Sequence, residues 1–138
     1  MLARREHSEC ELTRKLQHKK FDINDIRLVI AALTQEGLLS NKRFTENYIH
    51  YRRNKGYGPL RIRLELSERG IPEDLIEQHL EIADNAWLDH ARTVFRKRFK
   101  NAFPTDLKTR AQQMRFLQHR GFTREHIESV WKSCQKND

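Results

Sequence analysis

Apolar residues recur along the chain at one spacing that appears three times. Successive positions in each copy are separated by four, five, five and four residues. The copies are Leu12, Leu16, Phe21, Ile26 and Ile30; Ile62, Leu66, Ile71, Ile76 and Leu80; and Gln113, Leu117, Phe122, Ile127 and Trp131. Gaps of four residues fit one face of a helix, and the two gaps of five residues between them interrupt that spacing. The pattern is typical of a helix, a tight turn and a second helix. We therefore predict three helical pairs, with Phe21, Phe122 and Trp131 packed in their cores.

Helix start and stop signals in the first copy agree with this pattern. Ser8 and Glu11 have the spacing of a capping box, in which each side chain bonds the backbone N–H of the other residue. The helix that follows is predicted over residues 9–19. Asp22 is expected to cap the second helix, and Gly37 to end it in a left-handed conformation.

The other two copies carry similar signals. Pro59 fits the first position of a helix that Gly70 would end. In the third copy, Thr105 is expected to cap a helix that ends at Gly121, and Thr123 to cap the last helix.

Each copy also has room for a leading helix. Residues 41–54 and 83–99 carry aromatic and apolar residues at helical spacing. The first copy has only residues 1–5 ahead of its pair, so its leading helix should be short, frayed or missing. The predicted fold is all-α, with three tandem three-helix units that form an elongated, curved array. The expected units are residues 1–40, 41–82 and 83–138.

The composition favours a soluble helical protein. Hydrophobic residues make up 37% of the chain and charged residues 33%, with only five glycines and three prolines for the turns of a β-fold. The two cysteines, Cys10 and Cys134, follow no disulfide framework, and the N-terminus has no apolar signal segment. No stretch is long and apolar enough to span a membrane. We expect a monomer in the cytoplasm without a membrane partner.

Positive charge marks the candidate binding residues. The net charge is +8, and residues 86–138 carry twelve basic against five acidic residues. A first cluster flanks a glycine turn and consists of Arg52, Arg53, Lys55, Tyr57, Arg61 and Arg63. A second, weaker candidate consists of Arg92, Arg96, Lys97, Arg98 and Lys100. Such residues can neutralise phosphates or clamp carboxylates. The alternative is that cations near a helix C-terminus only complement its dipole.

No constellation in the sequence supports catalysis. The seven histidines include no HExxH pair, and there is no CxxC, Walker loop or dinucleotide fingerprint. The acidic residues of 73–81 follow helical spacing and fit a solvated helix face better than a metal site. We therefore predict no enzyme activity, no cofactor and no metal.

Several short segments occur in an order known from one family. They are 2–8 (LARREHS), 11–16 (ELTRKL), 36–39 (EGLL), 55–62 (KGYGPLRI), 69–71 (RGI) and 116–122 (FLQHRGF). In these segments the chain resembles the RecX family of recombinase regulators. The GYGP turn with its flanking basic residues is the most specific element. Members usually carry a longer N-terminal helix ahead of the first segment, and this chain departs from that pattern.

The resemblance implies a function that spacing and composition do not. RecX-type proteins bind the filament that the RecA recombinase forms on single-stranded DNA. They inhibit its ATP hydrolysis, strand exchange and coprotease activity, and they also bind single- and double-stranded DNA. For this chain the implied role is a regulatory one.

Two other classes fit the same residues. A sequence-nonspecific helical DNA-binding protein would act on DNA alone, without a recombinase. A general helical adaptor would carry the basic clusters only incidentally.

Overall fold

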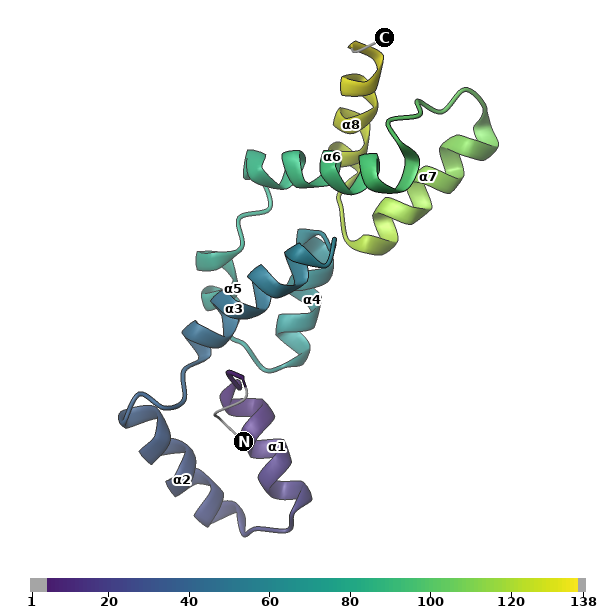
Figure 1. Ribbon diagram of the computed structural model, residues 1–138. Coiled ribbons are helices and arrows are strands. Elements are labelled where there is room, and N and C mark those ends of the chain that lie inside the picture. Colours follow the sequence, from purple (N-terminus) through teal and green to yellow (C-terminus); the bar gives the residue numbers. More distant parts are fainter. Residues whose placement is uncertain (1–4, 137–138) are drawn as a thin grey trace. The chain divides into compact units, whose positions relative to one another are not determined.

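The computed structural model describes residues 5–136, and this part of the chain is built from α-helices without a strand (Figure 1). The helices are α1 (Glu9–His18), α2 (Ile23–Gln35), α3 (Asn41–Asn54), α4 (Pro59–Glu68), α5 (Glu73–His79), α6 (Asn85–Phe99), α7 (Leu107–Arg120) and α8 (Arg124–Lys136). The three predicted pairs are α1 with α2, α4 with α5, and α7 with α8. The predicted leading helices of the second and third copies are α3 and α6. The all-α prediction of tandem three-helix units is confirmed.

The helices gather into two compact units, which are described separately below. Unit 1 comprises the residues up to His50 together with Leu64–His79. Unit 2 comprises Tyr51–Arg63 and the residues from Leu80 onward.

In unit 1, a capping box starts α1 as predicted. The Ser8 hydroxyl accepts a hydrogen bond from the Glu11 N–H at 3.0 Å, and the Glu11 carboxylate accepts from the Ser8 N–H at 3.2 Å. Burial alone would raise the pKa of Glu11, but hydrogen bonds from Arg5 and Ser8 outweigh it and hold that pKa below its usual value. Asp22 occupies the N-cap position of α2 but, contrary to expectation, its side chain makes no capping hydrogen bond. Its carbonyl still accepts from the Ile26 N–H, so the backbone alone begins this helix.

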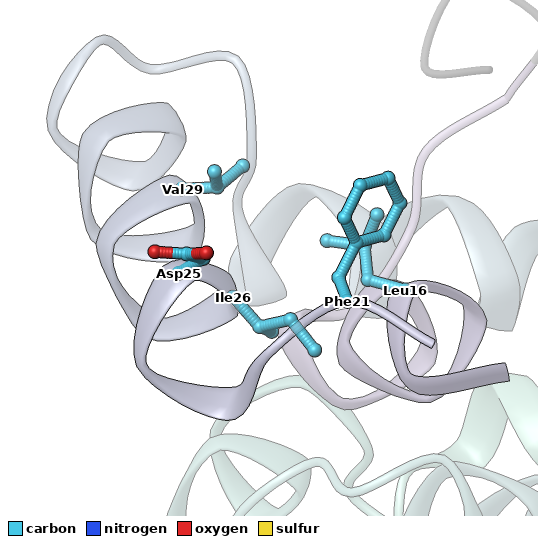
Figure 2. Close-up of a pocket in the computed structure, with 5 residues that line it drawn as sticks. All are labelled: Leu16, Phe21, Asp25, Ile26 and Val29. Carbon is cyan, nitrogen blue, oxygen red and sulfur yellow. The ribbon is translucent and has the colours of Figure 1, made fainter. Parts of the chain in front are cut away.

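The core position predicted for Phe21 is wrong, because 55% of this residue is exposed. Its counterparts Ile71 and Phe122 are buried. In the third copy, α6 packs over the helical pair, whereas residues 5–8 ahead of α1 are not helical and residues 1–4 lie outside the described part. An open pocket of about 120 Å³ lies beside Phe21 and is lined by Leu16, Phe21, Asp25, Ile26 and Val29. Figure 2 shows Ile26 pointing from α2 toward Leu16 and Phe21.

Unit 2 has a continuous apolar core between α6, α7 and α8. It consists of Ala91, Val94, Phe95, Leu117, Phe122, Ile127, Val130, Trp131 and Cys134. The polar repeat position, Gln113, is also buried, and both its amide nitrogen and its amide oxygen are hydrogen-bonded. Its amide donates to the Ala102 carbonyl at 2.9 Å and accepts from the Trp131 indole N–H at 3.0 Å.

The N-cap predicted for α7 is wrong, and the N-cap predicted for α8 is confirmed. The helix α7 begins at Leu107, so Asp106 rather than Thr105 holds the N-cap position, and its carboxylate accepts from the Thr109 N–H at 2.7 Å. At α8, the Thr123 hydroxyl accepts from the His126 N–H at 3.1 Å, as expected. Within residues 5–136, no helix is long and apolar enough to cross a membrane.

Candidate functional site

The glycine turn between α3 and α4 lies within unit 2 and rests on the C-terminus of α7. The Gly58 N–H donates to the Arg120 carbonyl at 2.6 Å, and the Leu60 N–H donates to the Gly121 carbonyl at 2.9 Å. These bonds satisfy carbonyls that the end of a helix leaves without an intrahelical partner. The start of α4 therefore serves as a cap for α7.

Two glycines allow this close approach of backbones. A Cβ atom at Gly58 would lie 2.6 Å from the carbonyl carbon and oxygen of Gly121. A Cβ atom at Gly121, where φ is +101°, would lie 2.5 Å from the Arg61 Cβ. Real Cβ atoms do not approach other heavy atoms so closely, so both positions require glycine.

Three arginines surround the ring of Tyr57. The guanidinium carbons of Arg52, Arg61 and Arg120 lie 3.8, 4.7 and 5.0 Å from the ring centroid. These distances are within the range of cation–π attraction, which offsets part of the repulsion between like charges. We refer to these four residues as the Tyr57 cluster.

Hydrogen bonds fix two of these arginines to the backbone. Arg61 Nη1 donates to the His119 carbonyl at 3.1 Å, and Arg120 Nη1 donates to the Lys55 carbonyl at 3.1 Å. The segments that supply the cluster, residues 47–64 and α7, contain no acidic residue. A fixed group of guanidinium ions in such surroundings is suited to bind phosphate or carboxylate groups.

The rest of the first predicted cluster is distributed around the same turn. Lys55 lies over the exposed ring of Tyr51, with its Nζ 5.5 Å from the centroid, and Arg63 is exposed on α4. Arg53 lies near His90, whose pKa is lowered first by burial and then by the positive charge of Arg53. The structure thus brings Arg52, Arg61 and Tyr57 together but places Arg53, Lys55 and Arg63 in other surroundings.

The second predicted cluster does not form one surface. Arg92 donates to Asp89 at 3.2 Å and lines a pocket together with Arg96. Arg98 instead lies over the rings of Phe99 and Phe116, with centroid distances of 5.3 and 5.5 Å. The charge of Lys97 acts on His90, and Lys100 is the left-handed C-cap of α6, with φ of +54°.

Sequence reasoning missed Arg120, which is distant from the glycine turn along the chain. A signal was present in the repeat, since Arg69-Gly70 and Arg120-Gly121 occupy equivalent places at the ends of α4 and α7. In unit 1, the Arg69 carbonyl accepts from the Ser8 hydroxyl at 2.8 Å, and the Arg69 guanidinium lies 4.8 Å from the Tyr48 ring centroid. In both units the Arg-Gly pair at the end of one helix thus accepts a hydrogen bond at the start of another, from the Ser8 hydroxyl in unit 1 and from backbone N–H groups in unit 2; we call each contact an Arg-Gly joint.

Histidine, cysteine and carboxylate side chains do not assemble into a metal site in the described part of the chain. No group of three or more such residues has a suitable arrangement there. The chemistry that the site offers is anion recognition.

Two family models match this chain. A model of the second three-helix domain of RecX matches residues 40–80, and one of the third three-helix domain matches residues 84–131. The chain belongs to the RecX family. Curated relatives named "Regulatory protein RecX" agree with this over most of their length. The Pseudomonas entomophila protein is 44% identical over 127 residues, covering 92% of this chain and 82% of that protein. The Halorhodospira halophila protein is 38% identical over 138 residues, covering 100% of this chain and 86% of that protein.

The fold agrees with solved RecX structures. The crystal structure of RecX from Lactobacillus salivarius has a TM-score of 0.81 at 20% sequence identity, covering 97% of this chain and 89% of that chain. At this identity the likeness concerns the fold alone. This likeness agrees with the tandem three-helix units described under Overall fold.

Proposed function

We propose that this RecX-family chain is a non-enzymatic regulator of the RecA recombinase. It binds the RecA filament on single-stranded DNA and inhibits ATP hydrolysis, strand exchange and coprotease activity. Membership of a family of regulatory proteins supports the class of function. The observation that carries the contact is the Tyr57 cluster, in which three arginines are held on one ring.

The Tyr57 cluster acts as a preorganised contact for anionic groups of the filament. Because Arg61 and Arg120 are already bonded to backbone carbonyls, binding orders few additional rotamers. Phosphates of the bound strand and carboxylates on the recombinase surface both fit guanidinium forks. Contacts to neighbouring recombinase subunits would oppose the ATP-linked rearrangement between them. The regulator acts in the cytoplasm as a monomer of three repeat units, residues 1–40, 41–82 and 83–138.

The decisive test is ATP hydrolysis by RecA preassembled on single-stranded DNA, with the wild-type chain and an Arg52→Gln/Arg61→Gln variant titrated in. The wild-type chain should inhibit at well below one copy per recombinase. Loss of charge-assisted bonds worth roughly 1.5–3 kcal/mol each should raise the half-inhibitory concentration by about tenfold or more. An Arg27→Gln/Lys42→Gln variant loses the same charge from exposed positions of α2 and α3 and should inhibit as the wild type does. A folded Arg52→Gln/Arg61→Gln protein that inhibits normally would remove the Tyr57 cluster from the contact.

A second function, sequence-nonspecific DNA binding without a recombinase, is favoured by the twelve basic against five acidic residues in 86–138. Such binding should weaken steeply with salt, because neutralised phosphates release counterions. Binding to bare single- and double-stranded DNA with no inhibition of preassembled RecA would favour this function over the first.

A further inference from the structure

A polar pocket lies between α6 and α8 in unit 2, apart from the Tyr57 cluster. Figure 1 shows these two helices crossing, and they share the core described above. The pocket has a volume of about 350 Å³. Its lining residues are Arg92, Arg96, Asn101, Val130, Ser133 and Cys134. None of them belongs to the Tyr57 cluster, so the pocket is a separate candidate site.

Two arginines supply the charge of the pocket. Arg92 and Arg96 are four residues apart on α6 and therefore share a face of the helix. Arg92 Nη1 bonds Asp89, but its Nε–H is buried and has no acceptor among the protein atoms. Since 41% of the Arg92 side chain is exposed, the remaining N–H groups of its guanidinium can donate to an oxygen-rich ligand in the pocket.

The remaining wall adds a further donor and an apolar surface. Asn101 follows the C-cap of α6 in a left-handed conformation, with φ of +61°, and its amide can donate to a ligand oxygen. Val130 and the buried thiol of Cys134 line the side formed by α8. The volume falls at the lower end of the roughly 300–1,000 Å³ that small-molecule sites occupy. It exceeds what a bare phosphate needs.

We propose that this pocket binds a phosphate group carried on a ligand of about one nucleotide in size. The two guanidinium groups and the Asn101 amide bind the phosphate oxygens, and Val130 with Cys134 contacts the attached sugar or base. A free nucleotide and one nucleotide of a DNA strand present the same chemistry. This inference does not depend on RecA.

The test measures binding of deoxyadenosine 5′-monophosphate and of deoxyadenosine to the full chain by calorimetry, without RecA. The nucleotide should bind and the nucleoside should bind at least about tenfold more weakly, since only the first carries the phosphate. An Arg92→Gln/Arg96→Gln variant should lose about the same factor. A control, Lys108→Gln/Arg115→Gln, loses the same charge from exposed positions of α7 and should bind as the wild type does. Equal binding of nucleotide and nucleoside, no binding of either, or full binding by the folded Arg92→Gln/Arg96→Gln variant would overturn the proposal.

Cys134 provides a second readout inside the pocket. In a Cys10→Ser background, in which Cys134 is the sole thiol, bound nucleotide should slow its modification by a thiol reagent. Unchanged modification at saturating nucleotide would contradict the proposed location. If Arg92→Gln/Arg96→Gln does not fold, Arg96→Gln alone removes an exposed arginine and must still weaken binding for the proposal to stand.

The source of the phosphate is distinguished with a short oligonucleotide that lacks a terminal phosphate. If its binding weakens in Arg92→Gln/Arg96→Gln, a strand phosphate enters the pocket; if only the mononucleotide responds, the ligand is a free nucleotide. The Arg52→Gln/Arg61→Gln variant should keep its mononucleotide binding. The two pairs of variants thereby distinguish a failure of the nucleotide-binding proposal from a failure of the proposed role of the Tyr57 cluster.

Discussion

Replacing Gly121 with alanine should disrupt the joint that supports the Tyr57 cluster. Gly121 has φ of +101°, and a Cβ atom there would lie 2.5 Å from Arg61 Cβ, 2.6 Å from Arg61 N and 3.0 Å from the Gly58 carbonyl oxygen. Two of these three atoms belong to the backbone. The start of α4 must therefore move away from the end of α7.

The expected loss of stability can be worked from these contacts. The strained φ of a non-glycine residue costs about 1–3 kcal/mol. Separation of the backbones also weakens the Gly58 and Leu60 hydrogen bonds to α7, each worth about 0.5–1.5 kcal/mol. Together these terms predict a destabilisation of roughly 2–6 kcal/mol.

Gly56→Ala is the matched control, because Gly56 lies in the same turn with φ of +91°. A Cβ atom there would meet only side-chain atoms, Arg120 Nη1 at 3.3 Å and Val94 Cγ2 at 3.8 Å. Gly56→Ala should therefore lower the free energy of unfolding only by the cost of the left-handed backbone conformation, roughly 1–2 kcal/mol.

Urea unfolding followed by tryptophan fluorescence measures both variants. The chain has two tryptophans, Trp87 and Trp131, and both are buried in unit 2, so the signal reports on the unit that contains the joint. If Gly121→Ala loses no more stability than Gly56→Ala, the close approach of α4 and α7 contributes nothing and this reasoning is refuted.

Three further predictions concern stability. Burial is the main cause that lowers the pKa of His7, His90 and His126 below the usual value of 6.5, so each favours the neutral form in the folded chain. Below pH 6.5 the unfolded chain takes up protons at these histidines more readily than the folded chain does, so the stability that is complete above pH 6.5 is lost as the pH falls. The urea midpoint should therefore be lower at pH 5.5 than at pH 7.5, and a higher midpoint would contradict the lowered pKa values. Gln113→Ala leaves the Trp131 indole N–H and the Ala102 carbonyl without their partner and should cost about 2–4 kcal/mol by tryptophan fluorescence; a loss under about 1 kcal/mol would contradict it. Ser8→Ala removes the acceptor for Glu11 and the donor to Arg69, and should cost about 1–2 kcal/mol in urea unfolding followed by circular dichroism; an unchanged midpoint would show that the capping box is dispensable.

The fold could be predicted closely from the sequence because its signals are local. Helix ends follow from glycines that adopt a left-handed conformation and from side chains that cap the next amides. The α7 cap shows the limit of this approach. Thr105 and Asp106 both carry an acceptor oxygen. Which of them is the N-cap depends on whether the helix begins one residue earlier or later, and the sequence does not determine this.

Burial and long-range contacts were harder to predict. The repeat places Phe21 correctly between the two helices of its pair, but the spacing does not distinguish this exposed residue from its buried counterparts Ile71 and Phe122. Gln113 breaks the apolar pattern, and its burial is explained only by partners at Ala102 and Trp131. Arg120 joins the Tyr57 cluster because the third copy folds onto the glycine turn; the repeat marks Arg120 as the equivalent of Arg69, but it does not indicate which tyrosine the arginine will meet.

The two Arg-Gly joints provide an internal comparison for the site. Both place an arginine over a tyrosine, but in unit 1 carboxylates accompany the pair: Tyr48 donates to Glu65 at 3.0 Å, and Arg69 lies 3.9 Å from Glu11. In unit 2 the ring of Tyr57 holds three guanidinium groups, and the segments that supply them contain no acidic residue. In unit 1 the contact is made by a glycine, by one hydrogen bond from the Ser8 hydroxyl to the Arg69 carbonyl and by a single arginine over a tyrosine. Three guanidinium groups on one ring exceed the single arginine of the unit 1 contact, and this difference is why we propose partner binding at the Tyr57 cluster rather than at its counterpart.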